Sequence, residues 1–166
     1  MLPRGCKYNI ADLELILSPD VDPESFGNEA PRDGDEAAWE TLYRYADEMK
    51  ALAAKHGVEM RSLQCLGQVD TWPEGSDREK WGFAKAIHWI TLCHHLGLEF
   101  CQVGVNDQYE ATAPFGKTVA DLGYIADEAA KQNVKIAYES WNFAPRMSQW
   151  EGTWNVVKAA VGYAAG

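Results

Sequence analysis

The segment VKIAYESWNFAPRMS, residues 134–148, joins a short apolar stretch to a long polar loop that carries aromatic side chains. Its first part predicts a β-strand over residues 134–139, because Val, Ile and Tyr favour strands. Glu139 closes this strand, so its side chain is expected on a rigid support at the strand's carboxyl end. Ser148 and Glu151 form a capping box, which predicts a helix directly after the loop.

The same order of strand, loop and helix occurs twice before this segment. Strands are predicted over residues 58–66 and 99–105, each shortly after a glycine, Gly57 or Gly97, that ends a helix. The loops GQVDTWPEGS and NDQYEATAPFGK follow these strands, and both are long, polar and aromatic-bearing. Strands that alternate with single helices predict βαβ units with right-handed crossovers and a parallel sheet.

Amphipathic helices are predicted around these strands, because apolar residues recur at steps of three and four. Ser76 and Glu79 form a capping box that opens the second of them, and Asn133 is expected to end the third. The side chains expected to face inward are Trp39, Leu42, Ala46, Met49 and Ala53 in the first helix, Phe83, Ile87, Ile90 and Cys93 in the second, Val119, Leu122, Ala126 and Ala129 in the third, and Trp154, Val157 and Val161 in the last.

Two α/β architectures fit this rhythm, an open doubly wound sheet and a (β/α)8 barrel. No glycine-rich nucleotide-binding motif follows any predicted strand, which argues against the common nucleotide-binding folds. Long polar loops after the strands favour the barrel, because all such loops meet at its carboxyl-terminal face, where active sites are built.

The amino-acid composition limits the classes of function that the chain can have. The chain has 166 residues, of which 46% are hydrophobic, which is enough for one core. Its formal net charge of -10 would repel a nucleic-acid backbone, so no nucleic-acid partner is expected. No apolar run approaches the ~20 residues of a membrane span and no signal peptide is recognised, so we expect a soluble, cytoplasmic protein with no membrane partner. Reduced, mostly buried thiols are expected for the four cysteines, Cys6, Cys65, Cys93 and Cys101.

The candidate functional side chains lie at strand ends and in the loops after them. Glu139 is a candidate ligand for a hard divalent ion, which needs several oxygen donors, although a surface ion pair with Lys135 or Arg146 is the alternative. Trp141 would project near the mouth of a barrel and stack on a ring. Neutral hydrogen-bonding groups suited to hydroxyls are offered by Gln64, Gln102 and Asn106, for which packing or loop capping is the alternative.

The remaining polar candidates favour structural roles. Asp70, Glu74 and Asp107 are loop acids that we expect to be solvated. His94 and His95 lie near a helix end, where an imidazolium interacts favourably with the helix dipole. The stretch from Asp20 to Gly34 is rich in proline, glycine and acids and is expected to be a surface loop.

The segment YESWNFAPRMSQWEGTW, residues 138–154, resembles the fifth-strand motif of the xylose-isomerase-like barrel superfamily. The resemblance is greatest to the 3-dehydroshikimate dehydratases of fungi and bacteria, which carry Y-E-N-x-x-W-G-x-x-x-x-x-W-x-x-x-W. Matching positions are Tyr138, Glu139, Trp150 and Trp154, whereas Ser140 replaces Asn and Phe143 replaces Trp. SLQCLGQVDTWPEGSDREKW and HHLGLEFCQVGVNDQ are similar to the third- and fourth-strand segments of the family, so the resemblance covers about residues 35–161.

This resemblance implies a partial (β/α)8 barrel, roughly strands two or three to five, in a single partial domain over residues 1–166. It implies that Glu139 binds a divalent metal, Mg, Mn or Co, whose other ligands lie outside this chain. The implied reaction is the metal-assisted dehydration of 3-dehydroshikimate to protocatechuate in quinate and shikimate catabolism. A base removes the proton next to a carbonyl that the metal polarises, and hydroxide leaves. Arg146 replaces a histidine that is usual in this loop, and it would bind an anionic substrate.

Two alternatives remain open at this stage. The first alternative is a sugar or sugar-phosphate isomerase or epimerase of the same superfamily, which would act on a polyhydroxy substrate. The acidic composition disfavours a DNA-repair endonuclease of that superfamily. Alternatively, it is an inactive truncated fragment. A partial barrel would have two unpaired sheet edges, which predicts self-association through those edges.

Overall fold

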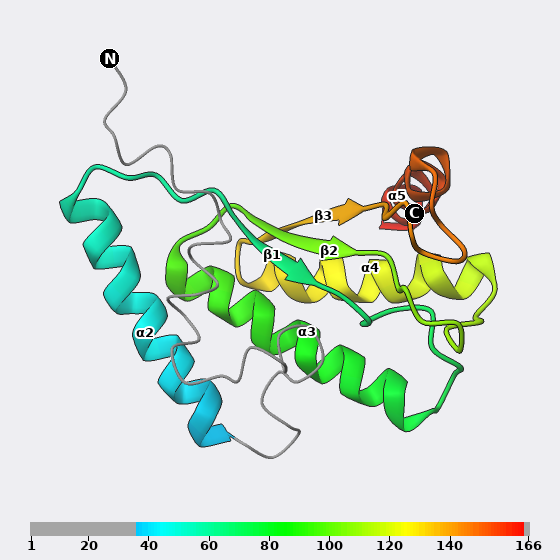
Figure 1. Ribbon diagram of the computed structural model, residues 1–166, viewed down its shortest axis with the longest axis horizontal. Helices are drawn as coiled ribbons and strands as arrows, with labels where there is room; N and C mark the ends of the chain where they lie inside the picture. Colours follow the sequence, from blue (N-terminus) through cyan, green and yellow to red (C-terminus); the bar gives the residue numbers. More distant parts are fainter. Residues whose placement is uncertain (1–35, 165–166) are drawn as a thin grey trace.

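The computed structural model describes residues 36–164, and it contains a parallel sheet with helices between its strands (Figure 1). The predictions for Cys6 and for the loop from Asp20 to Gly34 lie outside the described residues. In chain order the elements are α2 (Glu36–Lys55), β1 (Ser62–Leu66), α3 (Asp77–Leu96), β2 (Phe100–Gly104), α4 (Phe115–Lys131), β3 (Lys135–Glu139) and α5 (Trp150–Ala164). Each strand lies inside its predicted range and is shorter than predicted.

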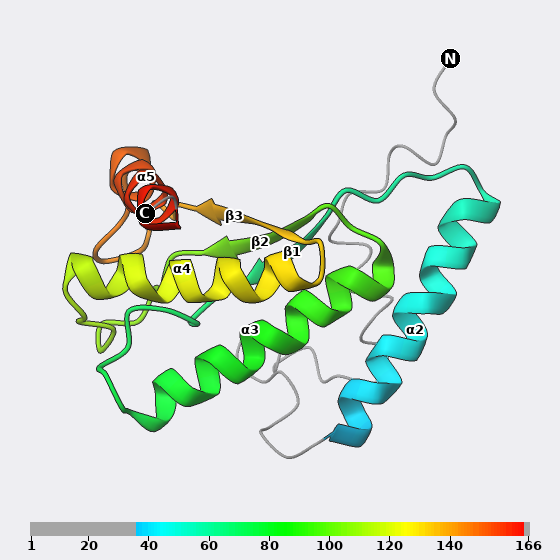
Figure 2. The ribbon, with the colours of Figure 1, turned by 180° about the vertical axis from the view of Figure 1, so that it is seen from behind.

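The sheet has the order β1-β2-β3, and both strand pairs are parallel. Figures 1 and 2 show α3 and α4 side by side on one face of this sheet, with α2 packed beside α3 and α5 at the far end of β3. A parallel sheet with its crossover helices on one face is a sector of a (β/α)8 barrel, because in an open doubly wound sheet the helices cover both faces. The predicted partial barrel is therefore confirmed.

The core lies between the sheet and the α3–α4 layer. Leu63, Cys101 and Val103 are fully buried on that face and contact the buried apolar side chains of both helices. Successive strand residues point to opposite faces, so the face away from the helices carries polar groups. The pairing of Gln102 with Ala137 and of Gly104 with Glu139 fixes the register on this second face, which we call the inner face.

Helix ends follow the local signals in the sequence. Gly57, Gly97 and Asn133 have φ values of 64°, 72° and 59°, the left-handed conformation that ends a helix. Ser76 Oγ accepts a hydrogen bond from the backbone N–H of Glu79 at 3.1 Å, as predicted for the first capping box. The Glu79 carboxylate accepts from the backbone N–H of Gly75 at 2.5 Å. In a standard capping box it would accept from the backbone N–H of the N-cap residue, Ser76, so its partner here lies one residue earlier.

The inward face predicted for the last helix is confirmed for Val157, which packs against the α4–α5 cluster, and is wrong for Trp154 and Val161. Trp154 and Val161 are 56% and 66% exposed, whereas α5 packs Val156 and Ala160 against α4. The helix carries two apolar stripes, and the one with Val156 and Ala160 is buried. The two exposed residues belong to the other stripe, together with Trp150.

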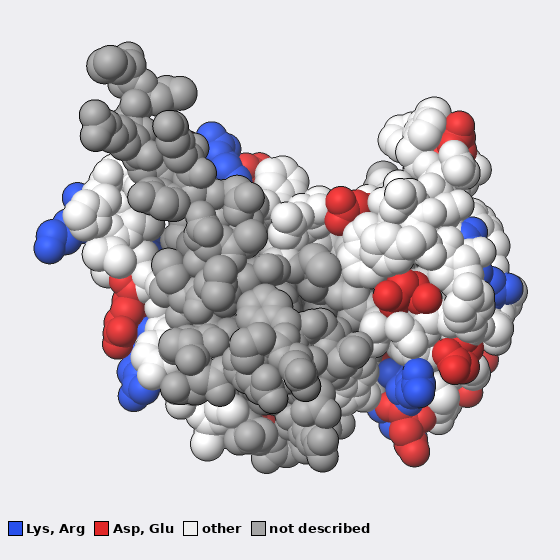
Figure 3. All heavy atoms as spheres, viewed as in Figure 1, with Lys and Arg blue, Asp and Glu red and all other residues white. Residues whose placement is uncertain are grey.

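Figure 3 shows Lys and Arg interspersed with Asp and Glu on the face in view, and the surface is hollowed above the strands next to α5. Among the described residues, no helix is long and apolar enough to cross a lipid bilayer.

Alanine at Gly123 is expected to stabilise the chain by about 0.5–1 kcal/mol, because glycine in a helix interior costs about that much relative to alanine. Gly123 lies inside α4, and a Cβ there would have no neighbour within 4 Å. Urea unfolding of Gly123→Ala measures the change. Gly82→Ala in α3 is the matched control, because its Cβ would come within 3.0 Å of the Val69 carbonyl oxygen, and it should destabilise instead.

Candidate functional site

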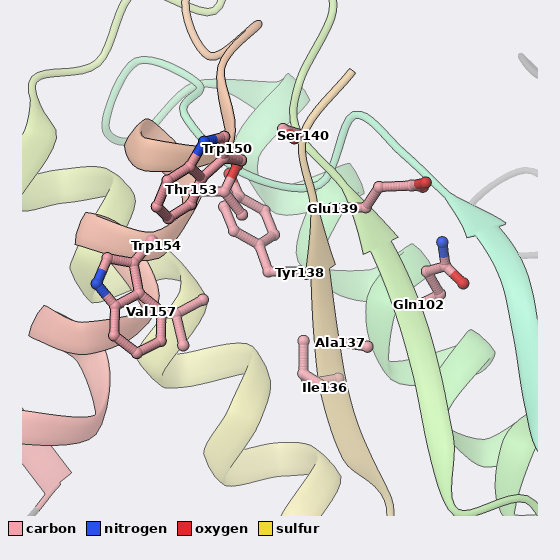
Figure 4. Close-up of a pocket in the computed structure, with 10 residues that line it drawn as sticks. All are labelled: Gln102, Ile136, Ala137, Tyr138, Glu139, Ser140, Trp150, Thr153, Trp154 and Val157. Carbon is pink, nitrogen blue, oxygen red and sulfur yellow. The ribbon is translucent and has the colours of Figure 1, made fainter. Parts of the chain in front are cut away.

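Glu139 is the last residue of β3 and lies on the inner face, opposite Gly104 of β2. Figure 4 shows its side chain pointing across β2, toward the side where Gln102 lies, while the neighbouring Tyr138 points toward α5. The placement of the carboxylate follows from strand alternation, because Ala137 and Glu139 share one face and Tyr138 takes the other. The carboxylate thus stands at the carboxyl end of the strands on a rigid element.

The indole of Trp141 covers the end of the inner face. Its Nε1–H donates a hydrogen bond to Oε2 of Glu139 at 3.0 Å. The ring lies against Gly67, just after β1, and against Gly104 at the end of β2. Phe143 stacks on it with the ring centroids 5.3 Å apart. Trp141 therefore lies near the barrel mouth as predicted, but its ring already has protein partners on the strand ends.

The other predicted site residues separate into two groups. Gln64 and Gln102 are half-buried and share the inner face with Glu139. Asn106 is buried, and its side chain bonds the Asp70 carbonyl oxygen at 2.7 Å and the Gln108 backbone N–H at 3.0 Å, the loop-capping arrangement that the sequence left open.

Arg146 connects two loops at the carboxyl ends of the strands. Its Nη1 donates to the carbonyl oxygens of Ala111 and Ala113 at 3.1 and 3.3 Å, so it holds the loop after β3 against the loop after β2. The surface ion pair considered for Glu139 does not form among residues 36–164, because Lys135 pairs with Glu99 at 2.9 Å. The structure places Gln64, Gln102 and Glu139 on the inner face with Trp141 at its end, and it leaves Asn106 and Arg146 in the surrounding loops.

Asp70 is a buried acid, and the prediction that it is solvated is wrong. Its side chain is 1% exposed, its Oδ2 accepts a hydrogen bond from the Tyr138 hydroxyl, and its Oδ1 has no hydrogen-bond partner. Burial raises the pKa of Asp70 to about 6, although the hydrogen bond from Tyr138 opposes that shift. The apolar neighbours Val69 and Trp72 in the stretch VDTW are the signal that would have indicated burial.

A second charged cluster ties the loop after β1 to the helices. Lys117 pairs with Glu79 and, at 2.6 Å, with Asp121, and the other Asp121 oxygen accepts from the backbone N–H of Thr71 at 3.0 Å. The hydrogen bond from Lys117 holds the pKa of Glu79 below its ordinary value, whereas burial raises the pKa of Asp121. Thr71 is held in this loop at φ 62°, a conformation that β-branched residues rarely adopt.

A groove runs along the free side of β3 (Figure 4). Its lining comes from both faces of the strand and from α5: Gln102, Ile136, Ala137, Tyr138, Glu139, Ser140, Trp150, Thr153, Trp154 and Val157. The groove is mostly apolar along α5 and polar where Glu139 and Gln102 lie.

Metal-ligating residues are sparse in this part of the chain. Within residues 36–164, no group of three or more His, Cys, Asp and Glu side chains is placed to hold a metal ion. His94 and His95 contact the Gln132 carbonyl oxygen and the Asp47 carboxylate, as expected for structural histidines. Cys93 and Cys101 are free, buried thiols, as predicted. Glu139 would therefore supply one ligand and cannot hold an ion by itself.

A parallel sheet with one helix-covered face and a carboxylate at a strand end on the other is the arrangement of a sector of an α/β barrel. The family model described as xylose isomerase-like TIM barrel matches residues 26–160, and the chain belongs to this family. A 3-dehydroshikimate dehydratase of Neurospora crassa is 26% identical over 95% of this chain, and the chain spans 45% of that relative's length. A solved xylose isomerase-like TIM barrel/4-hydroxyphenylpyruvate dioxygenase fusion protein matches with a TM-score of 0.65 at 22% identity, over 69% of this chain and 18% of its own, which shows the fold.

Proposed function

We propose that this chain is part of a 3-dehydroshikimate dehydratase, a carbon-oxygen lyase that removes water from 3-dehydroshikimate to give protocatechuate. The observation that carries the proposal is the 26% identity to the Neurospora crassa dehydratase over 95% of the chain. The placement of Glu139 supports it, because the carboxylate stands where barrel enzymes of this kind build their sites, at the carboxyl ends of the strands.

Within this proposal, the described residues have distinct roles. Glu139 offers one carboxylate to a divalent metal, whose remaining ligands come from outside residues 36–164. When bound, such an ion supplies Lewis-acid polarisation of a carbonyl. The amide groups of Gln64 and Gln102 lie on the same face and can bind the hydroxyls of a cyclic hydroxy acid. Arg146 is expected to orient the two loops at the mouth through its two carbonyl contacts.

Glu139→Gln is expected to lower the rate of dehydration by more than about 100-fold, because removal of a direct metal ligand costs more than the 10- to 100-fold loss typical of outer-shell changes. The appearance of the ultraviolet absorbance of the aromatic product measures it, in the presence of Mn²⁺. Glu99→Gln is the matched control, because Glu99 pairs with Lys135 at the opposite end of the strands and should leave the rate unchanged. Equal rates for wild type and Glu139→Gln would contradict the role of Glu139.

An isomerase or epimerase acting on a sugar or sugar phosphate is the second candidate. The neutral pair Gln64 and Gln102 is equally compatible with it, since amides bind the hydroxyls of a polyhydroxy substrate as well as those of a cyclic hydroxy acid. The two functions differ in product: interconversion of an aldose and a ketose without an ultraviolet-absorbing acid supports the isomerase. Absence of both activities supports the inactive-fragment hypothesis. Association of β3 with a second chain is a separate proposal, which sedimentation of the purified chain would test.

A further inference from the structure

Three strand ends hold the indole of Trp141. Its Nε1–H bonds Glu139 at the end of β3, and its ring lies on Gly104 at the end of β2 and on Gly67 directly after β1. Phe143 stacks on the ring at an interplanar angle of 26°. The ring therefore contacts every strand of the described sheet at its carboxyl end.

The two glycines are explained by the ring and not by their backbone conformation. Neither Gly67 nor Gly104 has a positive φ, so other residues could adopt the same backbone. A Cβ at Gly67 would come within 2.8 Å of Cη2 of Trp141, and a Cβ at Gly104 would overlap Cζ2 and Cε2 of the same ring. The glycines leave a shallow seat at the ends of β1 and β2, and the indole fills it.

This seat constrains the Glu139 carboxylate. The indole N–H is a donor with no acceptor capacity, so its bond to Oε2 occupies one lone pair of that oxygen and restricts the rotation of the carboxylate. Within residues 36–164 no other group contacts the carboxylate by a hydrogen bond or ion pair, so Oε1 is left for a ligand. A carboxylate held in this way has fewer orientations to lose when a ligand binds, which is how an outer-shell residue tunes a metal site.

We propose that Trp141 is a positioning residue for Glu139: the indole, seated on Gly67 and Gly104, orients the carboxylate so that Oε1 is presented to a metal ion. The metal-binding part of this proposal rests on the proposed function, whereas the positioning contact does not. The ring occupies the space above β1 and β2, so a substrate would meet its edge or its neighbours and would not displace it.

The positioning contact is tested on the chain itself, by nuclear magnetic resonance of the tryptophan indole N–H groups. Glu139→Ala should shift the resonance of Trp141 and lower its hydrogen-exchange protection by about 10- to 150-fold, the loss expected for one hydrogen bond to a charged acceptor. Trp141→Phe assigns the resonance by removing it. Glu99→Ala is the matched control and should leave that resonance unchanged. A Trp141 resonance that is insensitive to Glu139→Ala would overturn the proposal.

The consequence for metal binding is tested in the active enzyme that contains this chain. Trp141→Phe keeps a ring in the seat and removes the N–H, so the Mn²⁺ concentration that gives half-maximal activity should rise by about 10- to 100-fold. Trp141→Phe loses the hydrogen bond to Glu139, so its urea midpoint should fall no further than that of Glu139→Ala, whereas a purely structural role would lower the midpoint without changing the Mn²⁺ requirement. Phe143→Leu controls for loss of the stacking ring and should leave the Mn²⁺ requirement unchanged. An unchanged requirement in Trp141→Phe would overturn the positioning role.

The two sets of results also separate this inference from the proposed function. If Glu139→Gln leaves activity intact while Glu139→Ala shifts the Trp141 resonance, the contact stands and the metal-ligand role fails. If Glu139→Gln abolishes activity and Trp141→Phe leaves the Mn²⁺ requirement unchanged, the ligand role stands and the positioning role fails.

Discussion

Gly104→Ala is expected to destabilise the chain by about 2 kcal/mol, the middle of the range for overpacking a well-filled site. The added Cβ would overlap the Trp141 ring, which is held from its other sides by Phe143 and by the bond to Glu139. The ring must therefore leave its seat, which breaks the hydrogen bond and exposes the ring to water. Urea unfolding measures the free-energy change, and the loss of indole exchange protection reports the displaced ring.

The same substitution should change sign when the ring is absent. In a Trp141→Ala background the space above Gly104 is open, and alanine in a strand is favoured over glycine by up to about 0.5–1 kcal/mol. Gly104→Ala should then be neutral or stabilising, and the difference between the two backgrounds measures the coupling between residues 104 and 141. A cost that is equal in both backgrounds would show that Gly104 is required by something other than the indole.

Asp70→Asn is expected to stabilise the chain at pH 7 by up to about 3 kcal/mol, with little effect near pH 3. The pKa of Asp70 is about 6 in the folded chain, against an ordinary value of 3.8, because the carboxyl is buried. Between these two values the folded state binds more protons than the unfolded state, so the free energy of unfolding falls as the pH rises. Asparagine stays neutral and avoids this loss of stability. The loss is about 1.4 kcal/mol for each unit by which the pKa of the folded state exceeds that of the unfolded state.

Asparagine also fits the local hydrogen bonds. Its carbonyl oxygen can accept from the Tyr138 hydroxyl, as Oδ2 of Asp70 does. Its amide can donate to the Thr71 hydroxyl oxygen, which is buried without a partner in the described structure. Thermal or urea unfolding of both proteins from pH 3.5 to 7.5 gives the difference curve. Asp127→Asn, an exposed acid on α4, should stay within about 0.5 kcal/mol at every pH. A stability gain from Asp70→Asn that does not depend on pH would contradict the burial of an ionisable carboxyl.

Local signals in the sequence were enough for the elements and for the position of Glu139. Gly57, Gly97 and Asn133 end helices because the left-handed conformation is a property of single residues, and these residues tolerate it. The inner-face position of Glu139 follows from the two-residue period of a strand. Parallel pairing followed from the alternation of strands and helices, since a crossover helix returns the chain in the same direction.

Features that depend on distant segments were not predictable. Trp154 and Val161 of α5 were wrongly expected to face inward because both apolar stripes of the helix have helical spacing, and only the surface of α4 decides between them. Asp70 was assigned to solvent because burial of a loop acid depends on Tyr138, which belongs to another strand. The seat of Trp141 depends on two glycines from separate strands, whose shared role appears only when the strands lie side by side.

The order of the sheet has a consequence for how the chain folds. Each strand pairs with the next strand along the chain, β1 with β2 and β2 with β3, and each helix packs on the helix that precedes it or follows it. Each strand pairing therefore closes a loop of similar length, such as the one between Ser62 and Phe100 that contains α3, and no pairing requires a strand from a more distant unit of the chain. A strand and its helix can add to the structure as soon as both have left the ribosome, because their neighbours have already been synthesised.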